Sequence, residues 1–268
     1  MKDLTFLIPT RIETEDRLRN IISSVSYLLK HLPAKVIVKE VSNHPTFKHR
    51  AMPEIKKYSD TSNLTYLYEE TEEPLFCKSK VLNDLIVAAD TKFVVNYDAD
   101  CILPLTSYHQ AYAVLQSGKA DVVYPYGCGV YQWKAEYNMQ VYEEFVSTLD
   151  YRILDKRKTL SNSTIGWTQF VNRQKYIDSY MMNENFISWG CEDDEFYFRM
   201  STLGNRIARL DDYVYHLEHS RTHNSWFSSP KFNDNWNLWN KIKTFDRNQL
   251  IQYYEEQEYL KTRRKQLV

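Results

Sequence analysis

The sequence contains little glycine or proline, no long apolar run and almost no net charge. Only 6 glycines and 8 prolines occur in 268 residues, which argues against flexible linkers and disorder. No apolar run approaches the length of a membrane span. The formal net charge of −1 disfavours nucleic acid as a partner. What remains is an ordinary globular composition, 43% hydrophobic and 26% charged, with a high aromatic share of 15%.

Closely spaced cysteine pairs are also absent. The four cysteines lie far apart and form no C-x-x-C pair, so we expect free thiols in a reducing compartment. The chain opens at Met1 directly into an apolar segment, without the pattern of a signal peptide. These features predict a cytoplasmic protein, with at most peripheral contact to the inner face of the membrane. A fragment of a longer membrane-anchored protein has the same pattern.

Apolar strand patterns alternate with helical ones along the first hundred residues. A helix is expected from about Asp16, a candidate N-cap. The alternation predicts an α/β domain with a mixed, mostly parallel sheet flanked by helices on both faces. The expected strands are 4–9, 35–41, 64–68, 93–95, 120–125, 168–172 and 213–217. The other expected helices are 78–89, 139–149, 192–203 and 246–265, with an ordered loop or lid at 224–237.

Two aspartates, Asp98 and Asp100, follow the apolar run that ends at Val95. In open α/β sheets, ligands bind beyond the carboxyl ends of strands. Two carboxylates this close repel each other, and a divalent cation between them removes the repulsion. A solvated turn is the alternative, and on spacing alone the two interpretations carry about equal weight.

Three further stretches carry candidate chemistry. Four acids, Glu192, Asp193 and the two residues after them, lie at the start of an expected helix. Either the helix dipole favours acids at this position, or one of the four is a general base. His216 and His219 follow a strand at a spacing that suits a shared metal or two unrelated roles. Lys78 begins a helix where a cation opposes the dipole, which favours a diphosphate site over a solvated first turn.

Taken together, these stretches resemble the GT-A glycosyltransferases. The motifs, in chain order, are Phe76-x-Lys78-x-Lys80-x-Leu82-Asn83, Asp98-x-Asp100, Trp189-Gly190-x-Glu192-Asp193-Asp194 and His216-x-x-His219-Ser220-Arg221. The chain looks most like the branch that contains the β-galactosyltransferases and the galactosyltransferase-like half of bacterial chondroitin-type polymerases. The resemblance covers most of residues 1–223, and Pro9-Thr10-Arg11 is similar to the family's Pro-x-Arg after the first strand.

The resemblance implies a Rossmann-like GT-A domain at residues 1–225 with a packed C-terminal helical extension at 226–268. It also implies a metal-dependent enzyme that moves a hexose or hexosamine from a UDP-sugar to a hydroxyl of a saccharide or lipid-linked acceptor, with inversion. The implied cofactor is Mn²⁺ or Mg²⁺, held by Asp98, Asp100, His216 and His219. Asp193 is the implied base and Glu192 the neighbouring sugar contact. The implied donor-binding residues are Pro9, Arg11, Asn43, Lys78, Asn83, Asp98 and Trp189.

The chain departs from the family pattern near the acidic motif. The usual Gly-Gly-Phe is replaced by residues 180–184, and Cys191 replaces a common glycine, which leaves the donor and acceptor sugars open. A retaining GT-A enzyme, a nucleotidyltransferase and a non-catalytic carbohydrate-binding protein are the alternatives. A nucleotidyltransferase typically has a glycine-rich loop after the first strand, and residues 9–13 contain no glycine. The basic end at residues 261–265 suits an anionic membrane or a solvated helix end.

Overall fold

The computed structural model describes residues 1–160 and 164–267. The strands are β1 (Leu4–Thr10), β2 (Lys35–Ser42), β3 (Leu64–Glu70), β4 (Phe93–Tyr97), β5 (Cys101–Ile102), β6 (Val122–Tyr124), β7 (Gln132–Ala135), β8 (Lys158–Leu160), β9 (Thr168–Asn172), β10 (Ile207–Arg209) and β11 (Val214–Leu217). Seven of them form the central sheet in the order β10-β6-β9-β4-β1-β2-β3, and β5-β11-β7-β8 form a smaller second sheet.

The central sheet is mixed and mostly parallel, as predicted. β4, β1, β2 and β3 run parallel, as do β10 and β6. β9 lies antiparallel between β4 and β6. Every residue of β1 is buried, because the strand is central and helices cover both faces, which explains its continuous apolar pattern.

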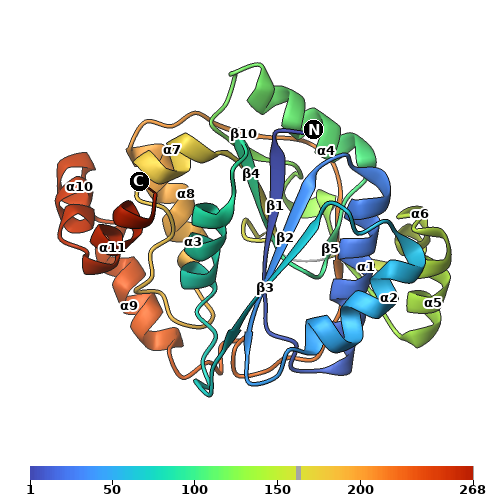
Figure 1. The fold of residues 1–268 in the computed structure, drawn as a ribbon. Helices are drawn as coiled ribbons and strands as arrows, with labels where there is room; N and C mark the ends of the chain where they lie inside the picture. Colours follow the sequence, from blue (N-terminus) through green and yellow to red (C-terminus); the bar gives the residue numbers. More distant parts are fainter. Residues whose placement is uncertain (161–163, 268) are drawn as a thin grey trace.

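Helices cover both faces of the sheet (Figure 1). They are α1 (Glu15–His31), α2 (Met52–Tyr58), α3 (Lys78–Ala88), α4 (Leu105–Gln116), α5 (Met139–Thr148), α6 (Arg152–Asp155), α7 (Arg173–Asp178), α8 (Glu192–Thr202), α9 (Phe232–Ile242), α10 (Arg247–Glu255) and α11 (Glu258–Gln266), with short π and 3-10 turns at Phe47–Ala51 and Gly129–Tyr131. One apolar core packs α1, α4 and α5 on the sheet, and a second packs α3, α8 and the C-terminal helices on the other face.

Three local predictions were wrong. The N-cap of α1 is Thr14, whose backbone is extended and whose hydroxyl accepts a hydrogen bond from Arg17 N; Asp16 lies inside the first turn. The segment 224–237 is not all loop, because α9 begins at Phe232. The single helix expected at 246–265 is divided into α10 and α11 by the extended residue Gln257, which a periodic apolar pattern does not detect.

The pairing of β5 with β11 positions two candidate metal ligands. β5 begins directly after Asp100, and β11 runs antiparallel to it with His216 opposite Cys101. The smaller sheet therefore brings Asp100 and His216 together although more than a hundred residues separate them in the chain. Among the described residues, no helix has both the length and the apolar character needed to cross a membrane.

Candidate active site

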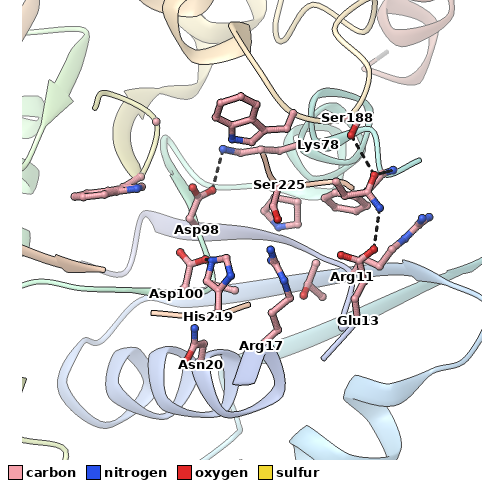
Figure 2. Close-up of a pocket in the computed structure, with 18 of the residues that line it drawn as sticks. Arg11, Glu13, Arg17, Asn20, Lys78, Asp98, Asp100, Ser188, His219 and Ser225 are labelled. Carbon is pink, nitrogen blue, oxygen red and sulfur yellow. Dashed lines mark hydrogen bonds and ion pairs between the residues drawn. The ribbon is translucent and has the colours of Figure 1, made fainter. Parts of the chain in front are cut away.

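A cleft opens at the carboxyl ends of β1 and β4 (Figure 2). Its walls come from the loop after β1, the start of α3, the loop after β4, the start of α8 and the segment after β11. The sequence-predicted residues that line it are Pro9, Arg11, Lys78, Asp98, Asp100, Trp189, Glu192, Asp193, His216 and His219. The tertiary structure therefore brings together all the predicted site residues except Asn43 and Asn83.

Asn83 and Asn43 do not belong to the cleft. The Asn83 side chain is fully buried; it donates to the carbonyl of Met182 at 2.9 Å and accepts from Met182 N at 2.8 Å. It follows Lys78 by five residues on α3, which places it on another side of the helix. Asn43 is exposed beyond the end of β2. The structure thus gives Asn83 the role of holding the loop that precedes α8.

A carboxylate and two imidazoles form a candidate metal centre. One ligand atom from each of Asp100, His216 and His219 lies within 4.8 Å of the other two. Asp100 Oδ2 is 3.1 Å from His219 Nε2 and 3.7 Å from His216 Nε2. Burial favours a higher pKa for Asp100, but the two histidines outweigh it and hold that pKa well below its usual range. One oxygen and two nitrogen donors suit a divalent transition metal such as Mn²⁺.

Two further side chains hold the His216 ring in place. Trp167 stacks on the imidazole with 5.2 Å between ring centroids. Glu218 Oε1 lies 3.5 Å from His216 Nδ1, on the side away from Asp100. A carboxylate behind a metal-binding imidazole orients the ring and increases its basicity. This arrangement fits a metal at the three-residue centre, and sequence reasoning did not assign Glu218 a role.

Asp98 contacts Lys78 instead of the three-residue centre. Lys78 Nζ lies 2.9 Å from Asp98 Oδ1, 3.6 Å from Asp193 Oδ2 and 3.9 Å from Glu192 Oε1. Burial raises the pKa of Asp98 to about 7, against the attraction of Lys78. The three carboxylates outweigh burial at Lys78 and raise the pKa of its ammonium group well above the usual value. The Lys78 ammonium thus balances part of the negative charge that the acidic motif brings into the cleft.

Asp193 projects into space that Gly166 leaves open. A Cβ atom at position 166 would collide with the Asp193 carboxylate. Gln169 Nε2 donates to Asp193 Oδ1 at 3.2 Å, and Lys78 faces the other oxygen. The carboxylate is therefore held from two sides and partly exposed to the cleft, as a group that accepts a proton from a bound substrate requires.

Residues other than glycine have left-handed backbone conformations in the segment that leads to the acidic motif. Cys191 has φ 67°, Tyr180 has φ 72° and Met181 has φ 55°. Left-handed geometry costs a non-glycine residue roughly 1–2 kcal/mol. Cys191 stands where the resemblance predicts a common glycine, and Tyr180 and Met181 lie in the segment that replaces Gly-Gly-Phe. The side chains therefore differ from the expected pattern, while the backbone at these residues has a conformation that glycine favours.

Glu192 is nearly buried, and it makes stability depend on pH. Burial, reinforced by Asp193 and opposed by Lys78, raises its pKa from 4.5 to about 8. Between these values the folded state holds a proton that the unfolded state has released, so the unfolding free energy falls as the pH rises through this window.

We therefore expect Glu192→Gln to stabilise the metal-free protein increasingly from pH 5 to pH 8.5, by about 1–3 kcal/mol at the upper end. The amide mimics the protonated acid, so the difference between variant and wild type is small at pH 5. Urea unfolding at several pH values measures it. Glu143→Gln, at an exposed position, is the control. A difference that does not change with pH would contradict the burial argument.

Sequence reasoning missed Arg17 and Asn224. Arg17 reaches from α1 into the cleft beside His219 (Figure 2), and its Nε and Nη2 atoms are buried without a hydrogen-bond partner among the described residues. Asn224 donates to Glu13 Oε1 at 2.8 Å and accepts from Phe76 N at 2.9 Å. It thereby ties the segment after β11 to the loops after β1 and before α3. No local pattern marks either residue.

The predicted nucleotide contact Arg11 is already engaged by the backbone. Its Nε donates to the carbonyl of Val41 at 2.8 Å, and its Nη1 donates to the carbonyls of Glu73 and Pro74 at 2.9 and 3.0 Å. Arg11 thus supports one wall of the cleft, whereas Arg17 keeps donors free.

The chain has the fold of the GT-A glycosyltransferases. Residues 156–220 match the family model described as the N-terminal domain of galactosyltransferase. Structurally similar proteins include TarS (residues 1–349) from S. aureus in complex with UDP-GlcNAc. The two chains are 18% identical and superpose with a TM-score of 0.59, and the match covers 90% of this chain and 65% of that chain. GalNAc-T7 with UDP, GalNAc and Mn²⁺ has 13% identity and TM-score 0.62, covering 94% of this chain and 50% of that one.

A third similar structure is the mannosyltransferase PcManGT from Pyrobaculum calidifontis with GDP-Man and Mn²⁺. It has 15% identity and TM-score 0.52, and the match covers 81% of this chain and 56% of that one. The chain thus spans less than two thirds of the length of each of these proteins. No curated protein sequence matches it. The resemblance to GT-A glycosyltransferases predicted from the motifs is confirmed, and with it the predicted fold class.

Proposed function

We propose that this protein is a metal-dependent glycosyltransferase that moves a hexose or hexosamine from a nucleotide sugar, UDP-linked, to a hydroxyl group of a saccharide or lipid-linked acceptor. The observation that carries the proposal is the coexistence, in one cleft, of the three-residue centre of Asp100, His216 and His219 with the positioned carboxylate of Asp193. The nucleotide sugars and Mn²⁺ bound to the structurally similar proteins support it, as does the galactosyltransferase match.

The proposed chemistry is a single displacement. Asp193 accepts the proton of the acceptor hydroxyl, whose oxygen forms the new bond to the anomeric carbon. The bond from that carbon to the diphosphate breaks, and UDP leaves with the electron pair. Asp100, His216 and His219 would hold a divalent cation, which would supply positive charge opposite the leaving diphosphate. Glu192, whose pKa burial raises, contacts a hydroxyl of the sugar.

Arg17 extends the predicted donor site. Its positive charge acts on Asp100, so a bound divalent cation would share the cleft floor with an unpaired guanidinium. Two such cations repel each other unless an anion lies between them, and a diphosphate meets that requirement. We infer that Arg17 contacts the donor diphosphate.

Arg17→Ala is therefore expected to weaken UDP binding in the presence of Mn²⁺ by about 10–100-fold, the range for losing a charge-assisted hydrogen bond. Calorimetric titration measures the change. Arg19→Ala, on the same helix but outside the cleft lining, is the matched control and should bind UDP normally. If Arg17→Ala binds UDP within twofold of wild type, the diphosphate contact is elsewhere.

A thermal-shift screen of nucleotide sugars with and without Mn²⁺ tests the proposed function. A ligand that binds only the native state raises the midpoint of unfolding by mass action, so the donor is the nucleotide sugar with the largest Mn²⁺-dependent shift. Its slow hydrolysis should also require the metal. Absence of any metal-dependent shift or turnover would refute the transferase. NMR of the product's anomeric proton then separates inversion from retention.

The C-terminal cations contribute less free charge than the sequence suggested. Arg263 is buried and pairs with Asp84 and with Glu184, the latter at 2.8 Å. Lys261 and Arg264 pair with Glu258 and Glu255. These ion pairs favour the interpretation of a helix end packed on its own domain over that of a membrane-binding patch, and the pair of Arg263 with Asp84 joins α11 to α3. A cytoplasmic location remains a prediction.

A further inference from the structure

An exposed aromatic surface begins at the mouth of the cleft. Trp226, Phe227 and Trp236 are 42%, 59% and 47% exposed, and together with the amides of Asn233 and Asn237 they are called here the α9 surface. Large aromatic side chains are normally buried because they carry much apolar area. Several of them exposed side by side indicate a binding surface.

The α9 surface is continuous with the cleft through Trp189, which lines the cleft. The Trp189 ring lies 4.9 Å from that of Phe227 and stacks on Phe232 at 5.7 Å. Phe232 in turn stacks on Trp236 at 6.2 Å. A row of rings therefore leads outward from the proposed donor site to the exposed side of α9.

Asn235 fixes this surface relative to the acidic motif. It is buried, its Nδ2 donates to the carbonyls of Ile187 and Trp189 at 2.9 and 3.2 Å, and its Oδ1 accepts from Ile187 N at 3.2 Å. The α9 helix is thereby fastened to the turn that carries Trp189. The surface is consequently held in place before any ligand arrives, which lowers the entropic cost of binding.

The amides beside the rings have no structural use. Asparagine is a poor helix former, yet α9 contains four in eleven residues. Hydrogen bonds to Ile187 and Trp189 explain Asn235. Asn233 and Asn237 are exposed, and in the described part of the chain neither side chain has a hydrogen-bond partner. Residues that lower the stability of a helix and make no stabilising contact indicate a functional role.

We propose that the α9 surface binds the neutral oligosaccharide chain of the acceptor. This proposal rests on the proposed transferase function. A sugar ring presents C–H groups on its faces and hydroxyls at its edge. The faces pack on aromatic rings, and the hydroxyls need the paired donors and acceptors that an amide supplies. Continuity with Trp189 leads such a chain toward Asp193.

Two other occupants fit the surface less well. Insertion into a lipid surface would place unpaired amides in an apolar medium, which is costly. It would also bring in the cations of Arg221 and Lys243, which lie over the Trp226 and Trp236 rings at 5.0 and 5.9 Å from the ring centroids. A second copy of this chain would have to bury the same amides without a demonstrated partner. A saccharide chain is the occupant that uses both the rings and the amides.

Calorimetric titration with three neutral hexasaccharides, cellohexaose, maltohexaose and chitohexaose, tests the surface. At least one should bind the wild type saturably, and Trp236→Ala should weaken its binding about tenfold or more. Asn233→Ala combined with Asn237→Ala should also weaken it. Tyr213→Ala removes an equally exposed ring whose neighbour Tyr131 lies outside the surface, and it should bind as the wild type does.

UDP titration with Mn²⁺ on the same samples separates this proposal from the function it rests on. Unchanged UDP affinity in Trp236→Ala shows that the variant is folded and the cleft intact. If no hexasaccharide binds the wild type, or if Trp236→Ala binds as tightly as the wild type, the proposal is overturned. Selective binding to anionic phospholipid vesicles, or dimerisation that Trp236→Ala abolishes, would also overturn it. Saccharide binding without any UDP binding would refute the transferase and leave only a saccharide-binding surface.

Discussion

Asp193→Asn is expected to abolish sugar transfer while leaving metal-dependent UDP binding intact. The amide keeps the size of the carboxylate and can still contact Gln169 and Lys78, but it cannot accept the proton of an acceptor hydroxyl. Loss of a general base typically costs about 10²–10⁴-fold in rate. Transfer is measured with the donor that the thermal-shift screen selects, and UDP affinity by titration with Mn²⁺.

The neighbouring acid provides the control for this experiment. Asp194 is exposed and does not line the cleft, so Asp194→Asn removes one charge from the same turn without touching the proposed chemistry. It should transfer sugar normally. Near-normal transfer by Asp193→Asn would show that another group is the base, and equal losses in both variants would show that charge on the turn, not proton transfer, is responsible.

Asp100→Ala is expected to eliminate the metal dependence of UDP binding. Asp100 is the only carboxylate among the three grouped candidate ligands of the described chain, and without it two imidazoles remain to bind a divalent cation. Loss of an outer-shell partner alone costs about 10–100-fold in metal affinity, so we expect a larger loss here. Titration with Mn²⁺ alone, before UDP is added, measures the loss directly.

Asp98→Asn distinguishes the two aspartates. Asp98 pairs with Lys78 and lies outside the three-residue centre, so this variant should retain most of its Mn²⁺ affinity. The resemblance to the family predicts a direct ligand at this position as well. If Asp98→Asn loses Mn²⁺ as completely as Asp100→Ala does, the metal lies between the two aspartates and Lys78 moves aside when it binds.

Local patterns were sufficient for much of the fold and for most of the site. Apolar runs identified β1 and β4 because these strands are buried on both faces. The apolar periodicity of α1 and α3 reflects the faces that pack on the sheet. The order of four motifs was specific enough to indicate the GT-A fold. The prediction failed for α9, where tertiary packing of Leu238, Trp239 and Ile242 overrides the low helix propensity of asparagine.

The amino-acid sequence was enough to establish which chemical groups the cleft contains, namely an aspartate pair, an acidic turn, two histidines and a lysine, because each is a short motif at a strand end or helix start. Which of these groups contact one another was decided by the packing of segments that lie far apart in the chain. The antiparallel pairing of β5 with β11 brings Asp100 to the histidines. The start of α3 brings Lys78 to Asp98, in the loop after β4, and to Asp193 on α8. Arg17, Asn224 and the α9 surface acquire their positions in the same way. Distances between segments far apart in a chain are set by packing, which no local pattern records.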